Sequence, residues 1–210
     1  AGIDLAGEET LLDIIKRHGG RAISTQSLPP KDAFAYDLFA KLVGATVFKH
    51  DSHQCFTPQI IADRLTFGRL ATYPSFDDED LADARCVIAW GVNFHATNPS
   101  KGVWVEAARK RGADVVVVDP RPTLAARRAS LWLRVRPGTD AILALGMLHV
   151  ILAEGLFDAA FVRQWTRGFD QLSDHVRPYT PEHVSQVTWV PAEDIVAAAC
   201  QRVIGACGGL

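Results

Sequence analysis

The N-terminal part of the chain alternates helical apolar patterns with short apolar runs. Apolar residues recur at helical spacing over residues 11–18 and 32–43, and the runs at 21–25 and 46–48 are typical of strands. Gly19 follows the first helical pattern, and glycine commonly stands just after the last residue of a helix. Two strands joined by a helix favour parallel pairing, because a parallel crossover needs about a dozen residues or more. The pattern therefore predicts a β-α-β unit.

The rest of the sequence continues this alternation. Strands are predicted at 86–90, 115–118 and 131–135, and helices at 58–67, 98–111, 141–154, 158–165, 181–187 and 191–204. Residues 115–118 are all valine, and a strand without a polar face is buried on both sides of its sheet. Apolar residues surround the helix at 141–154 almost completely, so it is predicted to be buried. The alternation predicts an α/β fold with a mostly parallel sheet and helices on both faces.

Composition narrows the class of protein. Of the 210 residues, 48% are hydrophobic and 22% charged, which excludes a disordered or collagen-like chain. The formal net charge is -2, so no overall attraction to nucleic acid or anionic lipid is expected, although Arg127-Arg128 could form a local basic patch. The longest apolar run, 141–153, contains His149 and is shorter than the ~20 residues that span a bilayer. We expect no nucleic-acid partner, no direct membrane span and no secretory signal, which leaves the compartment open between cytoplasm and periplasm.

The four cysteines, Cys55, Cys86, Cys200 and Cys207, are too few and too scattered for a disulfide framework. No two of them have the Cys-x-x-Cys spacing of a zinc or iron–sulfur site, so reduced thiols are expected. Cys86 lies in an apolar strand, where a buried and inert thiol is expected. Cys55 differs, because it follows the polar segment 49–54.

Three polar turns follow successive predicted strands. They are Gly91-Val92-Asn93, Asp119-Pro120-Arg121 and Pro137-Gly138-Thr139-Asp140. The carboxyl ends of parallel strands share one edge of a sheet, where ligands of such folds bind. Gly91 would let a phosphate approach the backbone, Asp119 could accept both hydroxyls of a ribose, and Asp140 matches the adjacent N1–H and N2–H₂ donors of guanine, a pair that adenine lacks. Three such turns on one edge support one another.

Each turn also has a purely structural interpretation. The first could be an ordinary strand–helix turn, and it lacks the Gly-x-Gly-x-x-Gly spacing of dinucleotide folds. Asp119 could cap a helix or pair with Arg121 at the surface, and Asp140 could cap the helix that follows it. These alternatives stay open on the sequence.

The residues around these turns resemble the molybdopterin oxidoreductases of the dimethyl sulfoxide reductase and formate dehydrogenase family. The stretches that carry the resemblance, in matching order and spacing, are 87–93, 107–113, 115–121, 136–140, 155–158, 161–162, 179–182 and 190–195. The resemblance covers roughly residues 50–205 well and the first 50 loosely. It implies a Rossmann-like domain.

The resemblance also implies a cofactor. In that family a molybdenum or tungsten ion is held by two molybdopterin guanine dinucleotides and one protein ligand, and Cys55 stands at the ligand's position. A following helix N-terminus would lower the pKa of the Cys55 thiol and favour the thiolate. The implied cofactor-binding residues are Gly91 and Asn93 at the diphosphate, Asp119 and Arg121 around the ribose, Asp140 at the guanine, and Gly138 in the same turn as Asp140. The chain would thus contain binding residues for one of the two molybdopterin guanine dinucleotides and not for the other.

The neighbours of Cys55 refine this expectation. In formate dehydrogenases of the family a histidine follows the metal ligand, whereas Phe56 follows it here, which argues against formate chemistry. His50 and His53 could carry protons near the metal, because imidazole titrates near neutral pH, or they could be solvated loop residues.

The resemblance implies that the chain is an internal piece of a large catalytic subunit and inactive alone. Residues 1–50 would belong to a flanking α/β domain, and 51–210 to the molybdopterin guanine dinucleotide-binding domain, incomplete at its C-terminus. An iron–sulfur cluster is expected in the missing N-terminal part. Expected partners are a small-molecule substrate, the rest of the subunit and an iron–sulfur electron-transfer subunit, and the reaction would transfer an oxygen atom, hydride or electrons.

Two other functions remain as alternatives. One is a non-catalytic scaffold, such as the large iron–sulfur subunit of NADH dehydrogenase, which resembles this family. The other is a module that binds NAD or ADP at the same sheet edge. Asp119 and Asp140 favour the enzyme over the scaffold, and the absent Gly-x-Gly-x-x-Gly turn weighs against the module.

Overall fold

The structure is a computed structural model that describes residues 5–26, 33–48, 56–69 and 84–204. These residues belong to two compact units, 1–75 and 76–210. The start of the cofactor-binding domain, expected at residue 51, stays a prediction. Within the described ranges, no helix is both long enough and apolar enough to cross a membrane.

The first unit contains the predicted β-α-β unit. Its strands β1 (Ser24–Gln26) and β2 (Thr46–Phe48) pair in parallel, with Thr25 opposite Val47, and α2 (Ala33–Val43) connects them. The other helices of this unit are α1 (Leu5–His18) and α3 (Thr57–Phe67). The parallel pairing is confirmed.

Two boundaries in the first unit differ from the prediction. β1 begins at Ser24 rather than at residue 21, because Gly20–Ala22 form a 3₁₀ turn in which the Ile23 N–H donates to the Gly20 carbonyl at 3.0 Å. α1 begins at Leu5 rather than at residue 11. Its first turns, residues 5–10, include Gly7 and show no apolar stripe in the sequence, so apolar spacing did not reveal them.

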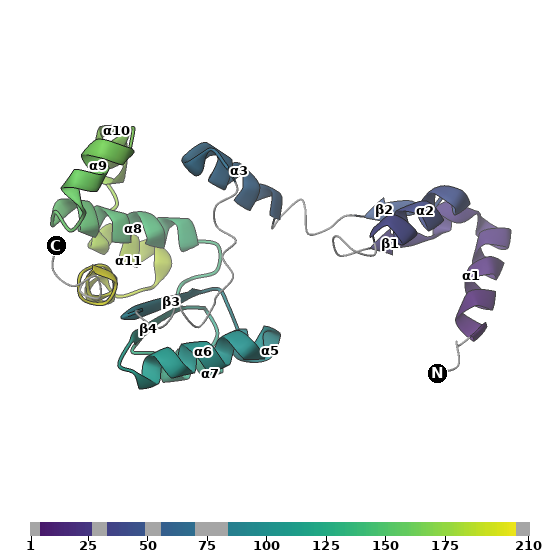
Figure 1. Ribbon diagram of the computed structural model, residues 1–210, viewed down its shortest axis with the longest axis horizontal. Helices are drawn as coiled ribbons and strands as arrows, with labels where there is room; N and C mark the ends of the chain where they lie inside the picture. Colours follow the sequence, from purple (N-terminus) through teal and green to yellow (C-terminus); the bar gives the residue numbers. More distant parts are fainter. Residues whose placement is uncertain (1–4, 27–32, 49–55, 70–83, 205–210) are drawn as a thin grey trace. The chain divides into compact units, whose positions relative to one another are not determined.

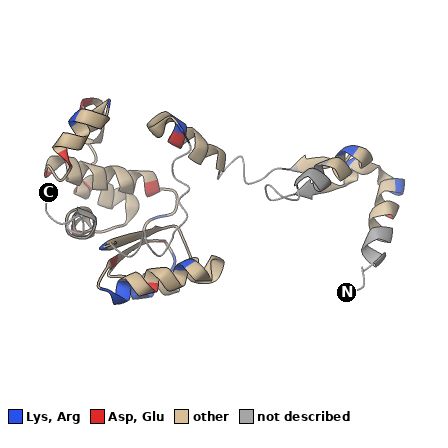
Figure 2. Ribbon diagram, viewed as in Figure 1, with Lys and Arg blue, Asp and Glu red and all other residues tan. Residues whose placement is uncertain are grey.

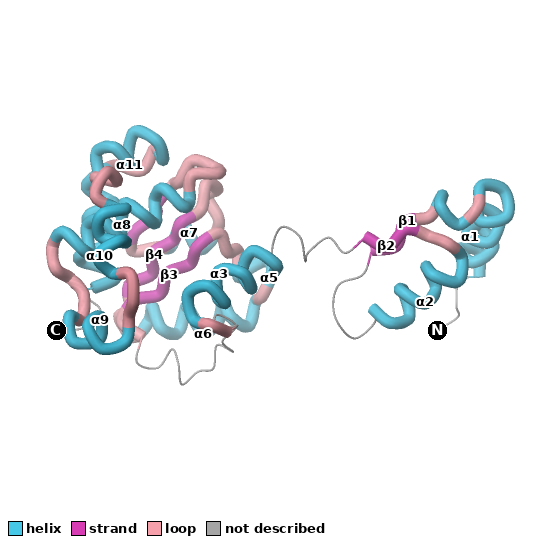
Figure 3. Tube along the Cα trace, turned by 90° about the horizontal axis from the view of Figure 1, so that it is seen from above, coloured by secondary structure: helices cyan, strands magenta, loops and turns pink. Residues whose placement is uncertain are grey.

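Three parallel strands form the sheet of the second unit: β3 (Cys86–Trp90), β4 (Asp114–Val118) and β5 (Leu131–Leu133). β4 lies in the middle, and Figure 3 shows β3 beside it. Val115 and Val117 face one side of the sheet, Val116 and Val118 face the other, and none is more than 3% exposed. The valine run is thus buried on both sides, because successive side chains of a strand point to opposite faces.

Helices cover both faces of this sheet (Figure 1). α6 (Pro99–Lys110) and α7 (Leu124–Arg128) pack on one face, and α8 (Asp140–Ala153) and α11 (Pro181–Thr188) on the other. The remaining helical segments are α5 (Phe94–Thr97), α9 (Ala159–Trp165), α10 (Phe169–Val176), α12 (Ala192–Val196) and the π-helical segment Ala197–Ile204. The arrangement confirms the predicted α/β, Rossmann-like fold.

Each face of the sheet has its own apolar core. The core under α8 and α11 includes the larger side chains Leu133, Leu143, Met147, Val184 and Ile195. The core under α6 and α7 includes the smaller side chains Val87, Val105, Ala108, Ala125 and Ala126. Small side chains let the helices of the second core lie close to the sheet.

Helix α8 is buried along its middle and exposed at its ends. Its buried residues are Leu143, Gly146, Met147 and Val150, whereas Ala141 and Ala153 are exposed. α10, α11 and α12 pack against α8 in addition to the sheet, which explains why nearly its whole circumference is apolar. The prediction of complete burial was therefore wrong for the helix termini.

Strand β5 ends two residues before its predicted end. Its last residue, Leu133, pairs with Val118, which is also the last residue of β4. Beyond that pair the chain turns: the Val135 N–H donates to the Leu133 carbonyl at 2.9 Å, and the Arg136 N–H donates to the Thr188 carbonyl at 2.8 Å. The segment after β5 is thereby attached to the end of α11.

Short helices account for most of the remaining differences. α5, α7 and α10 were not predicted; α5 and α7, of four and five residues, are too short to display a clear helical period. The single helix predicted at 191–204 is instead α12 followed by the π-helical segment. Apolar spacing alone cannot distinguish these two hydrogen-bond patterns.

A candidate nucleotide site at the carboxyl edge of the sheet

The three polar turns lie at one edge of the sheet of the second unit. Trp90, Val118 and Leu133 end β3, β4 and β5 and are neighbours in the parallel register. The turns that follow them contain Gly91, Asp119 and, after a longer connection, Asp140. The predicted shared location is confirmed, and the roles of these residues stay predictions.

The backbone of the first turn is hydrogen-bonded to the sheet, and there is free space beside Gly91. The Gly91 N–H donates to the Val118 carbonyl at 2.8 Å, and Gly91 has a φ of 62°. A Cβ atom built on Gly91 would meet no atom within 4 Å, so the positive φ, rather than crowding, favours glycine here. The Asn93 carbonyl accepts from the N–H groups of Ala96 and Thr97, while the Asn93 side chain makes no capping hydrogen bond to α5.

The second turn holds a buried carboxylate. Asp119 is 3% exposed, and its Oδ1 accepts the Arg121 N–H at 2.8 Å. The Arg121 Nε lies 3.9 Å from the same oxygen, and the Arg121 side chain is 71% exposed. The Asp119 carbonyl accepts the indole N–H of Trp132 at 2.8 Å, which fixes the turn against β5. Oδ2 of Asp119 receives no hydrogen bond from the described part of the chain.

The third turn holds the second carboxylate. Gly138 has a φ of 84°, and Thr139 occupies the N-cap position of α8, where its hydroxyl donates to the Arg136 carbonyl at 2.7 Å. Asp140 is the first residue of α8 rather than its cap, and its Oδ1 accepts the indole N–H of Trp90 at 2.9 Å. The capping interpretation of Asp140 is therefore wrong. Its other oxygen, Oδ2, has no hydrogen-bond partner among the described residues.

A cavity of about 500 Å³ opens beside the second and third turns. Its lining residues are Pro120, Arg134, Val135, Pro137 and Trp189. Pro120 follows Asp119 directly and Pro137 precedes Gly138, so the cavity adjoins both candidate turns. Guanidinium groups stack on indoles at this edge: Arg134 lies 5.9 Å from the ring centroid of Trp132, and Arg136 lies 5.3 Å from that of Trp189.

Sequence reasoning missed three participants in this site. Trp90 was read only as part of a strand, and Trp189 carried no pattern signal. Arg134 was read as part of the strand predicted at 131–135, whereas in the structure it directly follows β5. Trp90 and Trp189 contact their partners across about fifty residues of chain, which spacing along the sequence cannot reveal.

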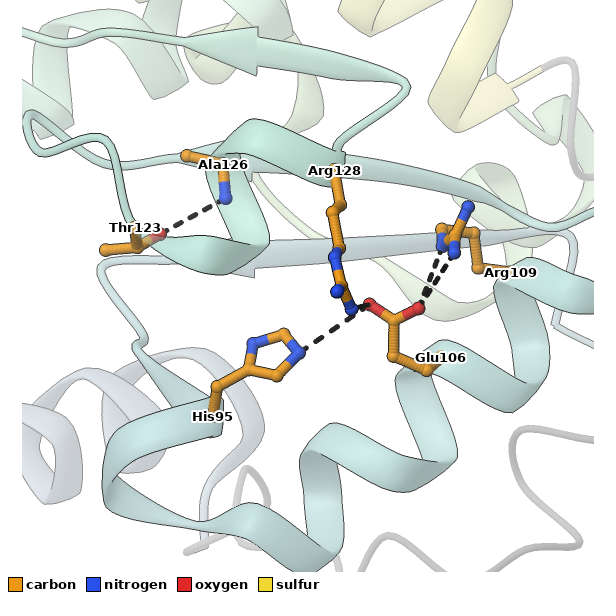
Figure 4. Close-up of polar contacts among 6 residues, drawn as sticks. All are labelled: His95, Glu106, Arg109, Thr123, Ala126 and Arg128. Carbon is orange, nitrogen blue, oxygen red and sulfur yellow. Dashed lines mark hydrogen bonds and ion pairs between the residues drawn. The ribbon is translucent and has the colours of Figure 1, made fainter.

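A charged cluster joins α5, α6 and α7, the helices that pack on one face of the sheet. Figure 4 shows Glu106 of α6 between Arg109 and Arg128, with the ring of His95 directed towards it. Arg109 donates to Oε2 of Glu106 at 2.9 and 3.0 Å, and the Arg128 Nη1 lies 3.5 Å from Oε1. Figure 2 shows basic residues gathered where α6 ends and along α7, so this cluster neutralises part of that charge.

The same cluster lowers the pKa of Glu106. Burial alone would raise the pKa of Glu106, but the hydrogen bond from Arg109 and the charges of Arg109 and Arg128 outweigh it and lower the pKa below its usual value. The His95 Nε2 lies 3.6 Å from Glu106, and neither ring nitrogen of His95 is hydrogen-bonded within the described residues. The cluster links α5, which follows the Gly91 turn, to α6 and α7.

A second cavity, of about 490 Å³, lies along the body of β3. Its lining is mostly apolar and includes Val87, Ala89, Phe94 and Trp104. It also reaches Val92 of the first turn and the polar residues Thr97, Asn98 and Lys101, but no residue of the Asp119 and Asp140 turns lines it. The cavity of about 500 Å³ is the one that adjoins the turns of Asp119 and Asp140, so it is the candidate for a nucleotide held by these two carboxylates.

The candidate metal ligand cannot be placed in this geometry. Cys55, His50 and His53 lie outside the described residues. Among the residues that the structure does describe, no group of three or more His, Cys, Asp or Glu side chains is placed to hold a metal ion. Cys86 and Cys200 are half-buried thiols that take part in no disulfide, and burial together with the charge of Glu154 raises the pKa of Cys200.

Comparison with known proteins places this chain among longer enzymes. The sequence matches the description of the molybdopterin oxidoreductase family over residues 8–180. Acetylene hydratase from Syntrophotalea acetylenica is 32% identical over 200 residues, which cover 91% of this chain and 26% of that protein. The alpha subunit of F420-dependent formate dehydrogenase from Methanocaldococcus jannaschii is 35% identical over 133 residues, which cover 63% of this chain and 20% of that protein.

A solved structure has a similar fold. Acetylene hydratase from Pelobacter acetylenicus superimposes with a TM-score of 0.67 at 31% sequence identity, over 92% of this chain and 26% of that chain. This chain thus spans between about a fifth and about a quarter of the length of these relatives.

Proposed function

Because the chain belongs to the molybdopterin oxidoreductase family, we propose that its second unit binds the guanine dinucleotide part of a molybdopterin cofactor. The family implies a molybdopterin cofactor with molybdenum or tungsten. The finer proposal is the bis-molybdopterin guanine dinucleotide form, one dinucleotide of which would lie at the carboxyl edge of the sheet. The chain would then be part of an oxidoreductase subunit that acts on a small molecule by transferring an oxygen atom, hydride or electrons.

One observation carries this proposal: two carboxylates beside a cavity each keep one oxygen unpartnered among the described residues. Asp119 and Asp140 are each held through Oδ1, by the Arg121 N–H and the Trp90 indole respectively. Each Oδ2 can therefore accept a hydrogen bond from a ligand. A ribose diol and the Watson–Crick edge of guanine are such ligands.

The backbone of the first turn fits the phosphate groups of the same ligand. Gly91 has a positive φ angle, and a Cβ atom built on it would meet nothing within 4 Å. Backbone N–H groups in such turns can approach phosphate oxygens closely. We propose that Gly91 and Asn93 contact the diphosphate, that Asp119 and Arg121 contact the ribose, and that Gly138 and Asp140 contact the guanine.

The metal supplies the redox chemistry of this cofactor, since it can cycle between oxidation states. The residues of this chain would position and hold the organic part of the group. The indole of Trp90 orients Asp140, and the Arg121 N–H orients Asp119, so both carboxylates are positioned before a ligand binds. We propose Cys55 as the protein ligand of the metal.

The first test is a comparison of two nucleotides. We expect the 210-residue chain to bind GDP about tenfold or more tighter than ADP, because adenine lacks the paired donors that Asp140 would accept and each hydrogen bond to a charged group contributes about 1.5–3 kcal/mol. Isothermal titration calorimetry with both ligands measures this preference. Because the two ligands have identical ribose and phosphate groups, the comparison isolates the base.

Two results would contradict the proposal in different ways. Equal affinity for GDP and ADP would remove Asp140 from the base-recognition role. Failure to bind either nucleotide at millimolar concentration would remove the nucleotide site from this sheet edge.

The proposed ligand Cys55 has its own test. Cys55 stands two residues before α3, and a helix N-terminus stabilises a thiolate, whereas burial raises the pKa of Cys200. We expect iodoacetamide to alkylate Cys55 with a pH midpoint below the ordinary value of about 8.5. Peptide mass spectrometry of the chain between pH 6 and pH 10 follows both thiols, with Cys200 as the internal control. A midpoint for Cys55 at or above that of Cys200 would argue against a thiolate site.

We also propose a partner subunit and an iron–sulfur cluster for the full-length protein. Some relatives are named as alpha subunits, which supports a partner subunit for electron transfer. We propose that an iron–sulfur cluster lies N-terminal to the present residues in the full-length subunit. Iron analysis of the purified full-length subunit checks this.

A further inference from the structure

Trp189 has a backbone conformation that is unusual for its size. Its φ is 66° and its ψ is 4°, and it is the one non-glycine residue with a positive φ among the described residues. It ends α11, where its N–H donates to the Ser185 carbonyl at 3.0 Å. Glycine adopts this conformation without a penalty, whereas a bulky side chain is strained. Some other interaction must favour tryptophan here.

Burial does not provide that interaction. Trp189 is 67% exposed, while its neighbours Thr188 and Val190 are both fully buried. The neighbours therefore anchor this corner in the core, and the indole adds little to it. An exposed aromatic side chain on a strained backbone is typical of a residue kept for binding rather than for stability.

The indole instead forms one wall of the cavity beside the candidate turns. The Arg136 guanidinium lies 5.3 Å from its ring centroid and so restrains the ring. Two other walls are Pro120 and Pro137, and Arg134 adds a positive charge. Flat apolar walls with a cation among the lining residues fit a planar heteroaromatic base that carries phosphates.

We propose that Trp189 stacks on the base of the bound nucleotide, with Arg136 as the residue that positions the indole. This inference rests on the proposed nucleotide site and deepens it, since it assigns a binding role to a residue that the three turns do not contain. Stacking does not discriminate between purines, because every base has a π-face. Trp189 would therefore supply affinity, and Asp140 would supply the preference for guanine.

If Trp189 supplies affinity and Asp140 supplies the preference for guanine, replacing Trp189 should change the affinities for GDP and ADP equally. We expect Trp189→Gly and Trp189→Asn to weaken GDP and ADP binding by the same factor, about fivefold or more, because stacking of a base on an aromatic ring contributes at least that much. The thermal unfolding temperature should stay equal or rise, since both replacements tolerate a positive φ. Trp189→Phe should keep most of the affinity.

Calorimetry with the 210-residue chain, GDP and ADP tests this, with Trp165→Ala as the matched control. Trp165 is 69% exposed at the end of α9 and does not line the cavity, so its replacement should leave both affinities unchanged. Fluorescence adds a direct signal: GDP should quench tryptophan emission in the wild-type chain, and less so in Trp189→Phe at saturating GDP.

The outcomes separate this inference from the nucleotide site itself. Unchanged GDP affinity in Trp189→Gly, with wild-type binding intact, would overturn the stacking role and leave the site standing. A large drop in unfolding temperature for both Trp189→Gly and Trp189→Asn would show a structural residue and overturn it as well. A wild-type chain that binds neither nucleotide would overturn both proposals.

Discussion

Replacing Asp140 with alanine is expected to lower the affinity of the chain for GDP by about 10- to 100-fold and to leave ADP binding almost unchanged. The carboxylate would accept two N–H donors of guanine, and the loss of a hydrogen bond to a charged group costs about 1.5–3 kcal/mol. Oδ1 of Asp140 already accepts from Trp90, yet a carboxylate oxygen has a second lone pair for a further donor. Calorimetric titration of wild type and variant measures the change.

Asp140→Asn is the matched control for folding. Its amide oxygen can still accept the Trp90 indole N–H, so the partly buried indole stays satisfied, whereas its NH₂ group would face the donors of guanine. We expect this variant to unfold at close to the wild-type temperature and still lose the preference for GDP. If Asp140→Asn kept a tenfold preference for GDP over ADP, the guanine role of Asp140 would be refuted.

Replacing Gly146 with alanine is expected to destabilise the second unit by about 1–3 kcal/mol, because extra volume in a packed core forces shifts of this cost. A Cβ atom at Gly146 would lie 2.8 Å from Cγ2 and 3.0 Å from Cγ1 of Val184, which is fully buried on α11. β-Branched Val184 has few alternative rotamers, so it cannot move aside easily. Chemical denaturation monitored by circular dichroism measures the loss.

Gly102→Ala in α6 is the matched control. Its Cβ atom would meet Phe94 at 3.4 Å and His95 at 3.6 Å, which are ordinary contacts, so the usual gain of up to about 1 kcal/mol for alanine over glycine in a helix is expected. The double variant Gly146→Ala with Val184→Ala should be more stable than the sum of the two single effects predicts, because the clash is gone. Additive effects would show that α8 and α11 adjust without strain.

The packing of α8 on α11 also bears on the nucleotide site. α8 begins at Asp140, and α11 ends beside Trp189. The packing of these two helices therefore fixes the position of one carboxylate relative to one wall of the cavity. We therefore expect Gly146→Ala to weaken GDP binding only as far as it disturbs the contact between Gly146 of α8 and Val184 of α11.

Local signals were sufficient to predict much of the fold. The valine run of β4 predicted a strand buried on both faces, and strands separated by helices predicted parallel pairing. Gly91, Asp119 and Asp140 were predicted to share one sheet edge, because parallel strands all end on the same side. These features depend on the order of strands and helices and on the spacing of apolar residues, and both can be read from the sequence.

Helix and strand boundaries depended more on partners in space. β5 stops at Leu133 because β4 stops at Val118, and the following Arg136 is bonded to the end of α11. α1 begins at Leu5 without an apolar stripe to mark its start. No local pattern in the sequence encodes where a neighbouring element ends.

The sequence by itself determined the α/β order of this protein, its buried central strand, the edge at which its polar turns meet and its resemblance to a cofactor-binding family. Only the tertiary structure decided how Asp140 is oriented, since the partner of its Oδ1 is an indole fifty residues away. It alone revealed Trp189 as a cavity wall, because a positive φ and a stacked guanidinium arise from the packing of α11 against the segment after β5. Periodicity records which side chains face inward, whereas hydrogen-bond direction and cavity shape depend on residues far apart in the chain.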